Sequence, residues 1–268
     1  MSPPPAPPIL TVDDVCVAYG DIPALDAVSF HVAPGDRIAV VGPNGAGKST
    51  LFKAITGILP VQAGTIVVHG HQAGVDHCVA YVPQRGEVDW SFPLSVADAV
   101  MHGRVGRIGW LHRPSAADRA HVHACLAAVR LEDLAGRQIG ALSGGQQQRM
   151  FIARALAQEA ELVLMDEPLT GLDARSRQDV LDVLDMLDAQ GIAVMVATHD
   201  LALAADVFER VLLLNQRLIA WGTPGDVLTE AHLMAAYRGH IRLVDTDRGR
   251  LVLGDVGHDG HAPHDRHG

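Results

Sequence analysis

The chain of 268 residues lacks the long apolar runs that a membrane span or an export signal needs. Its longest apolar stretches run to fewer than about ten residues, well below the roughly 18 that cross a bilayer. No charged segment followed by an apolar one opens the sequence. These absences argue against a membrane-spanning chain, and we expect a soluble protein that is not exported.

Cysteine and positive charge are also scarce. Cys16, Cys78 and Cys125 show no paired spacing, which argues against a disulfide framework or a zinc knuckle and favours reduced cytoplasmic thiols. The 21 Lys and Arg residues are outnumbered by 31 Asp and Glu residues, so the net charge is −10. Because nucleic-acid phosphates favour clustered Lys and Arg, we expect no nucleic acid as the main partner.

A glycine-rich segment at residues 42–50 is the most informative feature that is present. It matches the pattern G-x-x-x-x-G-K-[ST], in which backbone amides converge on phosphate oxygens while a lysine and a hydroxyl face the outer phosphates and Mg²⁺. The apolar run 37–41 predicts a buried parallel strand before it, and residues 50–57 predict a helix whose N-terminus faces the anion. We therefore assign nucleotide binding to Gly42, Pro43, Asn44, Gly45, Ala46, Gly47, Lys48, Ser49 and Thr50.

Two further apolar runs end in polar side chains. Asp166 and Glu167 follow residues 161–165, and His199 follows residues 192–197. Because the carboxyl ends of parallel strands form the ligand-binding edge of open α/β sheets, we expect these side chains beside the phosphate loop and its Lys48. There Asp166 can hold Mg²⁺, Glu167 can polarise the water that attacks the γ-phosphate, and His199 can contact that phosphate.

A second glycine-rich signal lies at residues 142–149, just before the carboxylate pair. Ser143 suits the N-cap of a helix predicted over 146–158, and Gly144 and Gly145 leave backbone amides uncovered. Ser143, Gly144, Gly145 and Gln146 therefore predict a second anion-binding helix N-terminus. A chain with one phosphate loop has little use for two such sites on a single nucleotide.

These motifs together resemble those of the nucleotide-binding subunit of ABC transporters, over roughly residues 9–240. In this resemblance residues 42–50 match the Walker A loop, 142–146 the signature sequence, and 166–167 the Walker B pair. Tyr19 matches the aromatic residue on which adenine stacks, Gln84 the Q-loop glutamine, Asp173 the D-loop aspartate and His199 the switch histidine. Every motif is present, and nothing in the sequence puts hydrolysis in doubt.

The resemblance implies an α/β protein, a P-loop NTPase of the ABC type with a RecA-like core, an antiparallel β subdomain and an α-helical subdomain. It implies ATP and Mg²⁺ as cofactors, with Ser49 and Gln84 beside Asp166 at the metal and with Lys48 and Gln84 among the catalytic residues. It also implies a head-to-tail homodimer, in which each ATP lies between the Walker A loop of one subunit and the signature segment of the other, with Asp173 nearby.

The same resemblance predicts further partners and a location. The expected partner is an integral membrane permease, which an extracytoplasmic metal-binding protein supplies, and the chain would be cytoplasmic and peripheral on the inner face of the cell membrane. Residues 85–96, 88–93 and 103–110 look like the manganese, zinc and iron branch of bacterial importers. An iron chelate or cobalamin is the alternative cargo. A non-transport ABC protein is a further alternative, but the chain lacks the long insertion or second cassette that such proteins carry.

The expected domain organisation follows the chain. Residues 1–8 predict a disordered arm, 9–240 the ATPase domain, and 241–268 a C-terminal extension. Within the domain we expect antiparallel strands over 9–38 and 64–82, a helical subdomain over about 87–140 with its helices within 94–135, and a final hairpin over 210–222 that turns at 215–216.

Two polar segments allow more than one interpretation. The basic residues Arg104, Arg107, His112 and Arg113 surround Trp110 and indicate either a solvated loop or a contact with a partner protein or lipid headgroups. His258, His261, His264 and His267 recur every third residue in the tail, which indicates either a disordered polar terminus or a weak site for Zn²⁺ or another divalent ion.

Overall fold

The computed structural model describes the chain apart from residues 1–6, 73–77, 110, 238–240, 247–248 and 255–268. A six-stranded sheet of order β10-β9-β3-β8-β7-β6 forms its centre. The strands are β3 (Arg37–Val41), β6 (Val79–Val82), β7 (Leu162–Asp166), β8 (Ala193–Thr198), β9 (Arg210–Asn215) and β10 (Arg217–Gly222). All pairs are parallel except β9 with β10. The predicted strand at 37–41 is therefore confirmed with the same bounds, and the predicted α/β class with it.

A second, antiparallel sheet has the order β2-β1-β4-β5. Its strands are β1 (Leu10–Tyr19), β2 (Ile22–Val32), β4 (Ala63–Val68) and β5 (His71–Gln72). The prediction that all of 64–82 joins this sheet is wrong, because β6 pairs in parallel with β7 in the central sheet. Four alternating residues are too few to tell an antiparallel edge from a core strand, and the pairing with β7 decides between them.

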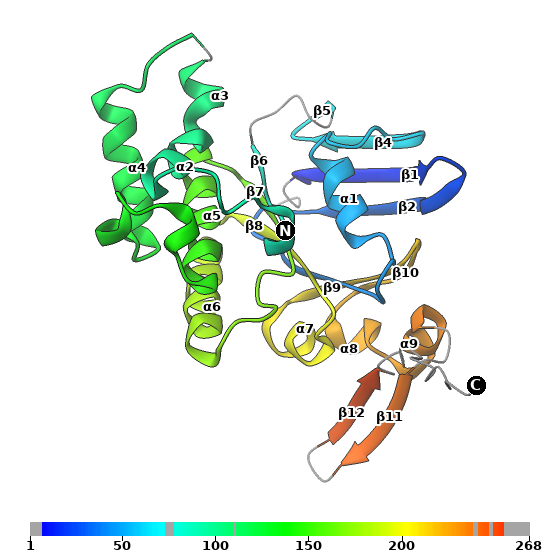
Figure 1. Ribbon diagram of the computed structural model, residues 1–268. Coiled ribbons are helices and arrows are strands. Elements are labelled where there is room, and N and C mark those ends of the chain that lie inside the picture. The colour runs from blue at the N-terminus through cyan, green and yellow to red at the C-terminus, as the bar shows by residue number, and fades with distance from the viewer. Residues whose placement is uncertain (1–6, 73–77, 110, 238–240, 247–248, 255–268) are drawn as a thin grey trace, which may run out of the picture.

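Helices cover the central sheet on the side away from the antiparallel sheet (Figure 1). Four of these helices form a helical lobe, namely α2 (Val96–Met101), α3 (Val105–Ile108), α4 (Ala116–Ala128) and α5 (Gly144–Gln158). Helix α6 (Ala174–Ala189) packs beside α5. The helices expected within 94–135 are present, although short 3₁₀ turns at His102–Arg104 and Glu132–Leu134 interrupt them. The remaining helices are α1 (Lys48–Ile55), α7 (Leu201–Val207), α8 (Pro224–Val227) and α9 (Glu230–Tyr237).

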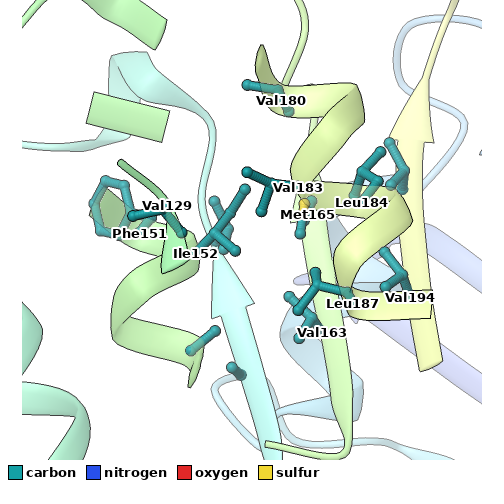
Figure 2. Close-up of a cluster of buried hydrophobic side chains, with 14 of the residues drawn as sticks. Val129, Phe151, Ile152, Val163, Met165, Val180, Val183, Leu184, Leu187 and Val194 are labelled. Carbon is teal, nitrogen blue, oxygen red and sulfur yellow. The ribbon is translucent and has the colours of Figure 1, made fainter. Parts of the chain in front are cut away.

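A hydrophobic cluster joins this lobe to the central sheet. Figure 2 shows Ile152 of α5 facing α6 over β7, where Met165 is fully buried, while Phe151 lies farther from α6, beside Val129. The α6 residues are Val180, Val183, Leu184 and Leu187, and Val163 and Val194 extend the cluster along β7 and β8. Because such cores are close-packed, the cluster holds the start of α5 and the end of β7 in a fixed relation.

The C-terminal part differs from the prediction. β9 and β10 form the expected hairpin, with Gln216 in the left-handed conformation at its turn. It is not the final hairpin, since β11 (Ile241–Thr246) pairs in antiparallel fashion with β12 (Gly249–Gly254). The histidine-rich segment lies outside the described residues. Among the residues that are described, no helix is both long and apolar enough to cross a membrane.

Candidate active site

The phosphate loop connects β3 to α1 and depends on glycine at two close approaches. A Cβ atom on Gly42 would lie 2.1 Å from the Leu214 carbonyl oxygen, and one on Gly47 would lie 2.5 Å from the Ala24 carbonyl oxygen. Gly47 is also the N-cap of α1 and adopts the left-handed conformation without a side-chain cap. The amides at this helix start are therefore not taken by a capping side chain, as an anion site requires.

Lys48 opens α1 and is buried beneath the loop. Its Nζ donates hydrogen bonds to the carbonyl oxygens of Gly42 at 2.8 Å and Pro43 at 3.0 Å. Burial lowers the pKa of the Lys48 ammonium, while the carboxylates of Glu167 and Asp166 act to raise it. The loop thus holds a cation beside two anions, a charge pattern suited to a polyphosphate with its metal ion.

Asp166 is the last residue of β7 and is buried, with 3% of its surface exposed. The Tyr81 hydroxyl donates to Asp166 Oδ2 at 3.5 Å, and Ser49 is a further hydrogen-bond partner. Burial raises the pKa of Asp166, the Ser49 hydrogen bond opposes this, and the neighbouring Glu167 charge reinforces it. A buried carboxylate beside a hydroxyl is a suitable ligand pair for a hard divalent cation.

Glu167 adopts the left-handed conformation, with φ of 49°, directly after the strand. Its Oε1 lies 3.2 Å from His199 Nδ1, and its Oε2 accepts a hydrogen bond from the Thr170 hydroxyl at 2.9 Å. The left-handed main chain and these two contacts together fix where the Glu167 carboxylate lies. Sequence reasoning missed Thr170, although its position three residues after the glutamate was a usable signal.

Lys48, Ser49, Asp166 and Glu167 line a pocket of about 420 Å³, a size within the usual range for small-molecule sites, whereas Gly42, Pro43 and His199 do not line it. The predicted residues that line it are Tyr19, Asn44, Gly45, Ala46, Gly47, Lys48, Ser49, Thr50, Gln84, Asp166 and Glu167. Tyr19 is half exposed, and its hydroxyl lies 3.4 Å from Thr50 Oγ1. Ile22, Pro23 and Ala24 of β2 and Gln216 of the hairpin turn complete the wall, and sequence reasoning missed all four.

The signature segment forms the start of α5, as predicted. Ser143 and Gln146 form a reciprocal capping box, since Ser143 Oγ accepts from the Gln146 amide and Gln146 Oε1 accepts from the Ser143 amide. Asp173 caps α6 through two 2.9 Å hydrogen bonds from Ser176, against which Gly145 packs. None of Ser143–Gln146 or Asp173 lines the pocket around Lys48. The chain therefore has two separate glycine-rich helix starts, one at the pocket and one away from it.

The described residues contain no group of three or more His, Cys, Asp or Glu side chains that could hold a metal ion. Mg²⁺ fits the pocket nonetheless, because it commonly takes one or two protein ligands and completes its shell with phosphate oxygens and water. Asp166, Ser49 and Gln84 supply a carboxylate, a hydroxyl and an amide for this purpose.

Two of the basic residues of this segment, Arg104 and Arg107, are paired with carboxylates. Arg104 forms ion pairs with Asp118 and Glu159, and Arg107 pairs with Glu159 at 2.8 Å. These contacts fasten α3 and α4 to the end of α5. The solvated-loop interpretation is wrong for Arg104, which lies in a 3₁₀ turn with its side chain largely buried against these carboxylates, whereas the Arg107 side chain stays half exposed.

Comparison with known proteins assigns the chain to a family. The family pattern described as ABC transporter matches residues 25–170. The manganese transport system ATP-binding protein MntB of Bacillus subtilis (strain 168) is 46% identical over 86% of this chain and 92% of its own length. The zinc transport system ATP-binding protein TroB of Treponema pallidum (strain Nichols) is 45% identical over 86% and 87%.

A solved structure gives the same answer for the fold. It is a chain of an ABC transporter in an inward-facing conformation, which matches with a TM-score of 0.79 and 30% identity over 93% of this chain and 99% of that one. The likeness therefore extends beyond the phosphate loop to the antiparallel sheet and the helical lobe. The chain belongs to the ABC transporter family, in which it is an ATP-binding subunit that hydrolyses ATP.

Proposed function

We propose that this chain powers the import of a divalent metal ion, namely manganese, zinc or iron, through a separate membrane permease. Matched relatives are named for manganese, for zinc and for chelated iron transport. The observation that carries the ATPase part is the placement of Glu167, which His199 and Thr170 hold at the rim of the pocket that contains Lys48.

The residues of the pocket suggest a division of work. Tyr19 offers a ring for adenine, the loop amides and Lys48 bind the phosphates, and Ser49, Gln84 and Asp166 would hold Mg²⁺. When bound, Mg²⁺ neutralises charge on the β- and γ-phosphates. The Glu167 carboxylate accepts a hydrogen bond from the attacking water and then its proton, which raises the nucleophilicity of the water oxygen. His199, in contact with Glu167, can hold the γ-phosphate on the opposite side of that water.

The second helix start supports a homodimer. Ser143–Gln146 and Asp173 lie away from the pocket of their own chain, so they are available to close the pocket of another copy. In the proposed arrangement the γ-phosphate of one subunit meets the α5 amides of its partner. ATP then joins two chains, and its hydrolysis separates them.

The proposal extends to the other partners. ATP-binding subunits of this family work with a membrane permease, and we propose that this one receives cargo that an extracytoplasmic metal-binding protein has delivered. The chain would then lie on the inner face of the cell membrane through the permease. We also propose that residues 9–240 form the ATPase domain, that about 87–140 form its helical subdomain, and that the remaining terminal segments lie outside it.

An uptake experiment tests the cargo. Cells that lack this chain would be supplied with the wild-type chain or with Glu167→Gln at equal expression, and accumulation of radioactive manganese, zinc and iron would be measured. We expect uptake of at least one free ion to depend on the wild-type chain and to be lost with Glu167→Gln. If only the uptake of an iron chelate or cobalamin depended on the wild-type chain, the metal-ion cargo would be refuted while the ATPase assignment would stand.

A further inference from the structure

The segment that follows Gln84 is fastened to α5 at two points. Arg85 Nε donates a 2.7 Å hydrogen bond to Gln147 Oε1. Trp90 packs edge-on against Phe151, with ring centroids 5.7 Å apart at an interplanar angle of 75°. Gln147 and Phe151 are four residues apart and therefore lie on the same face of α5. One face of this helix thus receives both contacts.

The contact of Arg85 lies at the first turn of α5. A Cβ atom on Gly144 would lie 3.1 Å from Arg85 Nη1, so the guanidinium lies directly beside this glycine. Gln147 is buried, with 3% of its surface exposed, and its side-chain oxygen accepts from Arg85. Without Arg85 this buried acceptor would lose that partner, which is costly.

The same segment is fastened to the nucleotide side by a different residue. Glu87 Oε1 accepts from Lys53 Nζ at 2.8 Å, and Lys53 belongs to α1, the helix that the phosphate loop begins. The Glu87 amide donates to the Gln84 carbonyl at 2.9 Å, so residues 84–87 form one tight turn. This turn therefore joins α1, through Glu87, to the signature end of α5, through Arg85.

We propose that Arg85 is a positioning residue: through Gln147 it sets the place of Ser143–Gly145 relative to Gln84 of the nucleotide pocket. The inference rests on the proposed head-to-tail dimer, in which Ser143–Gly145 meet the ATP of the partner subunit. Loss of Arg85 should therefore weaken ATP-driven closure of the dimer. It should not weaken the binding of ATP to the chain's own phosphate loop, because no pocket-lining contact is removed.

The test uses Glu167→Gln as the parent chain, so that ATP is bound without being consumed. Arg85→Met, Gln147→Met and the double variant would be compared with the parent for equilibrium ATP affinity of the monomer and for dimer formation as ATP is titrated. The matched control is Arg119→Met, which replaces an exposed arginine of α4 that donates to the Pro114 carbonyl oxygen. A thermal unfolding midpoint for each variant checks that the buried substitution has left the fold intact.

We expect monomer affinity for ATP to change by less than about twofold in all variants, and Arg119→Met to dimerise like the parent. Arg85→Met and Gln147→Met should each need on the order of ten times more ATP for half-maximal dimerisation, in line with the loss of a charge-assisted hydrogen bond. The double variant should be no worse than either single variant, because both remove the same contact.

Two outcomes would overturn the inference alone. Dimerisation of Arg85→Met at parental ATP concentrations would show that the contact does not set α5. A clearly larger defect in Arg85→Met than in Gln147→Met would show that the guanidinium acts by its charge rather than through Gln147. Failure of the parent itself to dimerise with ATP would instead refute the proposed dimer, and this inference with it.

Discussion

Replacing Glu167 by Gln is the most direct test of the site. The substitution keeps the length and shape of the side chain and leaves an oxygen that can still accept from the Thr170 hydroxyl, now 2.9 Å from Oε2. It removes the negative charge that would polarise water. It also leaves Lys48 in place, held by the carbonyl oxygens of Gly42 and Pro43.

The expected effects differ for turnover and for binding. A positioned general base contributes about 10²–10⁴-fold to a rate, so the ATPase rate should fall by that factor. At roughly 1.4 kcal/mol for each tenfold change, this corresponds to about 3–5.5 kcal/mol of transition-state stabilisation. ATP affinity should stay the same or increase, because a carboxylate at the rim repels the phosphates and its removal relieves that repulsion.

The assay combines steady-state phosphate release, equilibrium ATP binding and molecular mass in solution with ATP. Thr170→Val is the graded control: it removes one hydrogen bond to Glu167 but keeps the carboxylate, so turnover should fall by less than in Glu167→Gln. Wild-type turnover in Glu167→Gln would refute the assignment of the catalytic base. A parallel loss of ATP binding would show that Glu167 serves the pocket's structure rather than the chemistry.

Three further predictions concern other parts of the chain. Lys48→Ala should lose ATP binding. Mixing it with Ser143→Arg should restore part of the ATPase activity, because one site of the mixed dimer carries neither defect. No recovery of activity in dimers shown to be mixed would count against shared sites. Asp166→Asn should abolish Mg²⁺-dependent hydrolysis yet raise the thermal midpoint of the nucleotide-free chain. Burial raises the pKa of Asp166, so its contribution to stability is present below the unfolded-state pKa and is lost as pH rises through the folded-state pKa. The gain in thermal midpoint from Asp166→Asn should therefore shrink as the pH is lowered. A lower midpoint of Asp166→Asn than of the wild-type chain at neutral pH would contradict this. Deleting 255–268 should leave ATPase activity and dimerisation unchanged and reduce Zn²⁺ binding, measured by calorimetry, if the tail histidines bind metal; equal binding by both chains would exclude that role.

The parts of the fold that the sequence predicts best are those in which local chemistry and burial agree. β3 was predictable because a parallel strand buried on both faces appears as a short β-branched run between turns. The N-cap at Ser143 was predictable because capping depends on residues within one turn. Both signals lie in neighbouring residues of the chain, although β3 itself pairs with the distant strands β8 and β9.

The parts that escaped prediction depend on distant partners. Ile22 and Gln216 line the pocket because the antiparallel sheet and the β9–β10 turn approach the loop, and the Gln216 amide donates to the Ala46 carbonyl at 2.8 Å. Neither interpretation of the Arg104 segment, a solvated loop or a contact with a partner, included its ion pair with Glu159, which depends on how α5 ends beside the lobe. Such contacts join residues tens of positions apart, which no local pattern encodes.

The route between the two helix starts explains why the proposed dimer should couple its sites. Thr170 holds Glu167, and a few residues later Asp173 caps α6 through Ser176. A Cβ atom on Gly145 would lie only 2.6 Å from Ser176 Cβ, so the signature segment rests directly on that cap. A partner's ATP that shifts Gly145 must therefore also displace the segment that positions this chain's own Glu167. Ser143→Arg should accordingly disturb hydrolysis at both sites of a mixed dimer, which is why we expect the rescue by Lys48→Ala to be partial.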